Sequence, residues 1–162
     1  MMRKIISVLV TIVASFTGAA VQAEQFLTQS EFEKSRSIQV TTSPRTLQQL
    51  YSHGVSEHTE LKLEYFFFIN QEAKAASLNE ALVNLGYQGS YGRAVNDYKL
   101  FVITGWTPPM KMEVSTVTTW TESMCDLGFE FDTEFDGWGT NPSQYSRSLS
   151  FPSKLNNIKP AI

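Results

Sequence analysis

The chain has very little cysteine and histidine for its length. Its 162 residues include one cysteine and two histidines, so an internal disulfide is excluded. Cys125 is expected to be a buried, inert thiol. His53 and His58 have no cysteine nearby and no histidine partner at metal-binding helical spacing. We therefore expect no metal ion and no cofactor.

Sequence signatures of catalysis are missing as well. The chain has no serine-centred elbow, no phosphate-binding loop and no pair of carboxylates that stands out as an acid and base. We therefore expect that the protein is not an enzyme.

Positive charge is scarce. The chain has 13 Lys and Arg against 16 Asp and Glu, a formal net charge of −3. Removal of an N-terminal segment that carries Arg3 and Lys4 would leave 11 against 16, a balance of −5. Nucleic-acid binding relies on Lys and Arg to neutralise phosphates, so direct binding to nucleic acid is not expected.

The longest apolar run lies at the N-terminus. Arg3 and Lys4 precede an apolar stretch over residues 5–21, and the small-residue sequence "VQA" closes it. This pattern is typical of a secretory signal peptide, here residues 1–23, with cleavage after Ala23. Polar residues and a glycine interrupt the run, which favours a removed segment over a permanent membrane span. The sequence thus predicts a periplasmic or secreted protein.

The remaining 139 residues, 24–162, suit one domain. We expect a loose lead-in over 24–42, a domain over 43–140 and a poorly ordered tail over 141–162. The stretch "SPRTLQQLYSHG" predicts a short helix over 44–52, because Ser43 can cap it, Pro44 fits a first turn and Gly54 can end it.

The stretch "ELKLEYFFFI" predicts the strongest strand. Leu63, Tyr65 and Phe67 alternate onto one face, whereas Phe66 and Phe68 fall on the other. Because both faces become apolar, the second face is expected to have a cover of its own, for which the helix over 44–52 is the candidate.

The order of the remaining elements predicts the fold. "NQEAKAASLNEALVNLG" indicates an amphipathic helix, "YQGSYGRAV" and "YKLFVITGW" two strands joined at Asn96-Asp97, and "TPPMKMEVSTVTTWTESMCDLG" a second helix that ends at Gly128. "FEFDTEFDGWGT" supplies the last strand. This β-α-β-β-α-β order is that of an α+β, ferredoxin-like fold: an antiparallel four-stranded sheet with two helices on one face, here preceded by a short helix.

The closing "FDGWGT", placed after this order of elements and a proline-led second helix, resembles the RraB family of regulators of ribonuclease E activity. The resemblance spans about Thr46 to Thr140. It implies a non-enzymatic protein that binds ribonuclease E and inhibits it by contact. The predicted export signal supports an alternative, in which an exported immunity or partner-blocking protein of the cell envelope reuses the fold against a toxin or nuclease.

The closing segment also holds the candidate partner-binding residues. Glycines on both sides of Trp138 favour either a tryptophan folded onto the sheet or an exposed anchor in a partner's pocket. Alternation along a strand would place four carboxylates on one face, either as a solvated surface or as a site that attracts a basic partner. The candidates are Trp138, Asp136, Glu134, Asp132 and Glu130.

Overall fold

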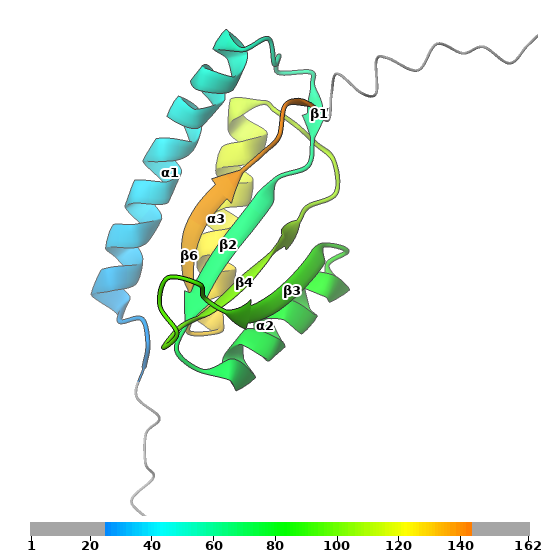
Figure 1. The fold of residues 1–162 in the computed structure, drawn as a ribbon. Coiled ribbons are helices and arrows are strands. Elements are labelled where there is room, and N and C mark those ends of the chain that lie inside the picture. The colour runs from blue at the N-terminus through cyan, green and yellow to red at the C-terminus, as the bar shows by residue number, and fades with distance from the viewer. Residues whose placement is uncertain (1–24, 144–162) are drawn as a thin grey trace, which may run out of the picture.

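A computed structural model describes residues 25–143 of the chain. The predicted signal peptide, with its cleavage site at Ala23, and the predicted tail beyond residue 143 lie outside these residues. The described part contains three helices and six strands, arranged as Figure 1 shows. In chain order they are α1 (Gln29–Ser52), β1 (Glu60–Leu61), β2 (Glu64–Ile69), α2 (Glu72–Asn84), β3 (Gln88–Arg93), β4 (Phe101–Trp106), β5 (Met110–Lys111), α3 (Val114–Glu130) and β6 (Glu134–Gly139).

The main sheet confirms the predicted ferredoxin-like α+β fold. Its four strands are antiparallel and lie in the order β3-β4-β2-β6, the arrangement of a split β-α-β repeat. The predicted alternation along β2 is also confirmed, because Tyr65, Phe67 and Ile69 are fully buried. β1 and β5 form a separate two-stranded sheet beside it.

The first helix is much longer than the sequence predicted. The expected loose lead-in over 24–42 is wrong, because α1 begins just after Thr28. Thr28 and Glu31 form a reciprocal capping box, which satisfies free N–H groups at the start of the helix. Pro44 therefore lies inside the helix rather than in its first turn.

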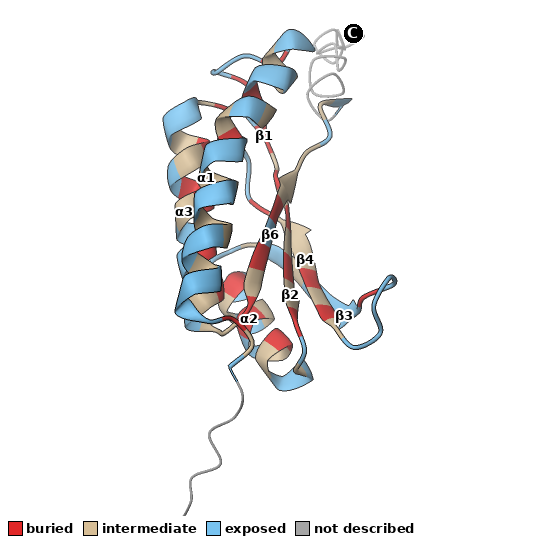
Figure 2. Cartoon of the chain, turned by 90° about the vertical axis from the view of Figure 1, so that its left-hand side faces the viewer, coloured by how far each residue is buried: buried red, intermediate tan, exposed pale blue. Residues whose placement is uncertain are grey.

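All three helices lie on one face of the main sheet (Figure 2). Leu47 of α1 is fully buried in the same core as Tyr65 and Phe67. The prediction that this helix covers the second face of the sheet is therefore wrong. That face carries no helix in the described part of the chain.

The second predicted helix ends later than expected. Gly128 lies inside α3, where it allows the helix to approach β2: a Cβ atom there would lie 2.9 Å from the ring of Phe67. The helix continues to Glu130, and Asp132, whose φ of 53° is left-handed, follows its C-cap residue Phe131. The N–H of Thr133 bonds to the carbonyl of Gly128 and that of Asp132 to Phe129, which is a Schellman ending.

This ending corrects the prediction of a long acidic last strand. Glu130 belongs to α3, Asp132 to the connecting turn, and only β6 is extended. The candidate carboxylates therefore do not line one face of a strand. None of the helices between residues 25 and 143 has the length and apolar character needed to cross a bilayer.

Candidate functional site

A β-bulge shapes the segment that holds Trp138. β6 pairs with β2, but the register shifts between Phe66 and Phe67, so that Asp136 is an extra residue without a partner. Gly137, with a φ of +117°, supplies the backbone angle that an L residue rarely adopts. A Cβ atom at this glycine would also lie only 3.0 Å from Gln39 Oε1. The bulge thus turns Trp138 toward α1.

Trp138 is held by a chain of hydrogen bonds between β6, α1 and α3. Its indole N–H donates to Ser43 Oγ at 2.9 Å. The hydroxyl of Thr121 donates to the carbonyl of Val117 at 2.9 Å. Ser43 therefore shares its own proton between Thr121 Oγ1, at 2.9 Å, and the carbonyl of Gln39, at 3.1 Å. Ser43 and Thr121 are both buried, so each polar atom in this network has a partner.

The ring of Trp138 packs edge-on against Trp120 of α3, with 6.5 Å between the ring centroids. Trp120 in turn packs edge-on against Phe135 and donates its indole N–H to the hydroxyl of Tyr87. Edge-on contacts of this kind stabilise aromatic cores. Trp138 is half-buried. Part of its ring therefore packs inside the fold, and part stays at the surface.

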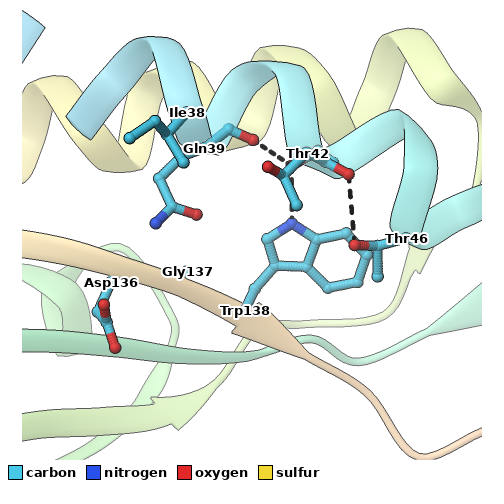
Figure 3. A pocket seen from close by; sticks show the side chains of 8 residues that line it. Ile38, Gln39, Thr42, Thr46, Asp136, Gly137 and Trp138 are labelled. Carbon is cyan, nitrogen blue, oxygen red and sulfur yellow. Dashed lines mark hydrogen bonds between the residues drawn. The ribbon is translucent and has the colours of Figure 1, made fainter. Parts of the chain in front are cut away.

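A polar groove of about 260 Å³ lies between α1 and β6 (Figure 3). Asp136 stands at its edge, with its carboxylate directed away from α1. Partial burial raises the pKa of Asp136 above its ordinary value. The groove offers hydroxyl and amide groups that can exchange hydrogen bonds with a bound side chain. Its lining residues are Ile38, Gln39, Thr42, Ser43, Thr46, Asp136, Gly137 and Trp138.

Asp132 is engaged within the fold. Its carboxylate accepts hydrogen bonds from the N–H groups of Phe26 and Leu27 and forms an ion pair with Lys74. Burial alone would raise its pKa, but the bonds with Lys74, Phe26 and Leu27 outweigh that effect and lower the pKa. This carboxylate therefore fastens the start of α1 to the turn before β6.

The other candidates are scattered. Glu134 is half-buried and accepts a hydrogen bond from Ser35 at 3.2 Å. Glu130 is exposed at the end of α3, and Asp136 is exposed at the bulge. Of the four predicted carboxylates, only Glu130 and Asp136 thus remain largely open to a partner.

Sequence reasoning missed the α1 side of the groove. Gln39 and Thr42 lie in the segment that was expected to be loose. The signal that identifies this helix was present in the sequence, because Thr28 and Glu31 have the spacing of a capping box. Cys125 is buried, as expected, and burial raises the pKa of its thiol to about 12, so the thiol is not a nucleophile at neutral pH.

The chain matches a protein-family model. The sequence model described as "Regulator of ribonuclease activity B" matches residues 41–140. The matched region includes the whole main sheet, α2, α3 and the C-terminal half of α1. The comparison with curated proteins found no match.

Proposed function

Because this chain belongs to the RraB family of regulators of ribonuclease activity, we propose that it inhibits ribonuclease E by protein contact. The observation that carries the proposal is the extent of the match, which includes the main sheet and most of the groove between α1 and β6. The family is one of regulators that act by contact, and its members are not enzymes. Ribonuclease E is the target that the closing "FDGWGT" implies.

Charge supports contact with a basic surface. Asp136 and Glu130 are exposed, and the chain as a whole is acidic. Exposed carboxylates on one partner accelerate encounter with a basic patch on the other, and salt weakens this effect. Asp136 lies at the edge of the groove, where its exposed carboxylate can meet a Lys or Arg side chain of the ribonuclease.

The test combines purified residues 24–162 with purified ribonuclease E and a labelled RNA substrate. We expect a complex and slower RNA cleavage. Asp136→Lys is expected to slow association and to reduce its salt dependence. Glu33→Lys is the matched control, because Glu33 is also exposed but lies outside the family match. Absence of both binding and inhibition by the unaltered protein would exclude ribonuclease E as the target.

The N-terminal sequence favours a second function. Residues 1–23 have the pattern of an export signal, and ribonuclease E works in the cytoplasm. An exported regulator would instead block a toxin or nuclease in the cell envelope through the same fold. Affinity capture from separate envelope and cytoplasmic fractions, with the partner identified by mass, distinguishes the two functions. A ribonuclease E complex in the cytoplasmic fraction supports the first, and an envelope nuclease supports the second.

A further inference from the structure

The face of the main sheet opposite the helices is apolar and uncovered in the described part of the chain. The strand register places Phe66 and Phe68 of β2 beside Thr104 and Val102 of β4 on this face. All four residues are half-buried. A sheet with one solvated face normally presents polar side chains there. Two phenylalanines of one central strand on this face therefore indicate a surface that binds another molecule or segment.

The connection between β3 and β4 projects from this face of the sheet and forms one wall of a hollow. Residues 94–100 bend out on the side away from the helices (Figure 2). Together with the sheet they enclose a hollow of about 420 Å³, whose floor includes Phe66, Phe68 and Val102. Val95 and Tyr98 in this loop are 83% and 77% exposed. Apolar side chains thus line the hollow and also stand free beside it.

Three carboxylates lie in or near this apolar hollow. Glu64 precedes Phe66 on the same face of β2, and Asp97 lies in the wall of the hollow. Asp136, on the neighbouring strand, directs its carboxylate away from α1 (Figure 3). Lys99 is a basic residue of the same loop. The rim is therefore mainly acidic, and an occupant with Lys or Arg beside its apolar residues would complement it.

We propose that the hollow over Phe66, Phe68 and Val102 binds an apolar segment of a partner protein that carries Lys or Arg at its ends. The proposal rests on the proposed function, because it assigns the surface through which a regulator of this kind holds its partner. A short segment fits a volume of this size: Leu and Phe side chains fill the hollow, and the flanking cations meet the acidic rim.

Single-stranded nucleic acid is the competing occupant. Ferredoxin-like sheets with exposed aromatic residues bind such strands by stacking bases on the rings. Here the same face carries Glu64 and borders Asp97 and Asp136. These carboxylates repel phosphates, and the chain lacks a basic excess. The charges thus favour a basic peptide over RNA.

The probe is a labelled synthetic peptide with a Leu-Phe-Val-Leu centre and two lysines at each end. Fluorescence anisotropy measures its binding to residues 24–162. We expect saturable binding that weakens at least about tenfold when glutamates replace the lysines or serines replace the apolar centre. Backbone amide shifts should change along β2, β4 and residues 94–100, and not along α1.

Phe68→Thr tests the site within the protein. Thr keeps a strand-forming residue while it removes the ring. Tyr91→Thr is the matched control, because Tyr91 is 41% exposed and pairs with the buried Ile103, on the helix side of the sheet. We expect Phe68→Thr to weaken peptide binding at least about tenfold, and Tyr91→Thr to leave it within about twofold. Equal binding by both variants would overturn the proposal.

Other occupants give different results, each of which would overturn it. A single-stranded oligoribonucleotide that binds more tightly than the peptide would show a nucleic-acid surface. A dimer that dissociates on Phe68→Thr would show that a second copy fills the hollow. Tighter peptide binding by a chain ending at Ser143 would show that residues beyond it occupy the hollow.

Binding to ribonuclease E separates this inference from the proposed function. If the unaltered protein binds ribonuclease E and Phe68→Thr does so equally well, the surface is wrong and the function stands. If the unaltered protein does not bind ribonuclease E but binds the peptide at this face, the proposed target is wrong and the proposed binding surface is retained.

Discussion

Trp138 and Ser43 join the closing strand to the first helix: the indole N–H of Trp138 donates to the Ser43 hydroxyl oxygen at 2.9 Å across 95 residues of chain. This bond is the central contact of the groove between α1 and β6, because Ser43 also meets Thr121 of α3. Its removal tests whether Trp138 serves the fold or the partner.

Trp138→Phe removes the indole donor and keeps an aromatic ring against Trp120. We expect a loss of about 1 kcal/mol in the free energy of unfolding, the usual net value of one hydrogen bond. Trp138→Ala should cost more and should weaken partner binding in parallel, because the groove loosens. Urea unfolding and binding titrations measure both. A loss of binding by about 2 kcal/mol with unchanged stability would instead identify Trp138 as an anchor.

Phe67→Ala and Trp120→Ala should each lower the free energy of unfolding by roughly 3–5 kcal/mol, the range for emptying a large aromatic site in a core. Phe67 is completely buried and Trp120 is 8% exposed. Denaturant midpoints provide the measurement. Tyr98→Ala is the control, since Tyr98 is exposed on the β3–β4 loop, and it should change stability by less than about 0.5 kcal/mol.

Gly128→Ala should destabilise the protein although alanine favours helix. The added methyl would gain roughly 1 kcal/mol of helix propensity. It would also lie 2.9 Å from the Phe67 ring and 3.0 Å from the Thr133 carbonyl oxygen, and overpacking costs about 1–3 kcal/mol. Gly92→Ala is the control, because nothing lies within 4 Å of its added methyl. Thermal unfolding of both variants compares them, and a stabilised Gly128→Ala would show that α3 can move away from β2.

Asp132 should make stability depend on acidic pH. Its pKa is lowered from 3.8 in the folded protein. Its contribution is therefore complete above the pKa of the unfolded chain, and it is lost as pH falls through the lower folded pKa. Asp132→Asn, which tolerates the same left-handed backbone, should cost about 1–3 kcal/mol at pH 7 and less at pH 3.

Asp136→Asn is the control with the opposite sign. Burial raises the pKa of Asp136, so its ionised form is less favourable in the folded protein than in the unfolded chain. Removing that charge should leave stability at pH 7 unchanged or slightly higher. A cost at pH 7 as large as that of Asp132→Asn would show that the ionised Asp136 has a stabilising partner.

The precursor should be cleaved after Ala23, and the product should lie outside the cytoplasm. The basic start, the apolar run and the "VQA" end motivate this expectation. Intact-mass measurement identifies the first residue, and cell fractionation identifies the compartment. A soluble cytoplasmic protein that begins at Met1 or Met2 would contradict it and would favour direct control of ribonuclease E.

The main sheet could be predicted from the sequence because the patterns that indicate its strands involve only neighbouring residues. Tyr65, Phe67 and Ile69 recur with period two, so the buried face of β2 follows from neighbouring residues alone. The order of helices and strands then leaves few topologies, and the antiparallel ferredoxin-like arrangement follows.

The extent of α1 and the position of Trp138 depend on distant residues. The polar stretch before Pro44 has weak helix propensity. It is held by contacts such as the hydrogen bond from Arg36 to Asp126, 90 residues away. Trp138 reaches Ser43 only because a bulge and a left-handed glycine reorient β6. The local periodicity of the sequence predicts neither the bulge in β6 nor the part of α1 that lies opposite it.

The contact between α1 and β6 also has a kinetic consequence. Ser43 leaves the ribosome long before Trp138, and any passage across a membrane would follow the same order. The contact between α1 and β6 can therefore form only after the last strand has been made, and closing so large a loop slows folding. Until β6 is in place, α1 lacks its contacts with that strand, and the apolar residues that β6 would cover can associate with other chains. Chains interrupted before β6 should thus require a chaperone or be degraded.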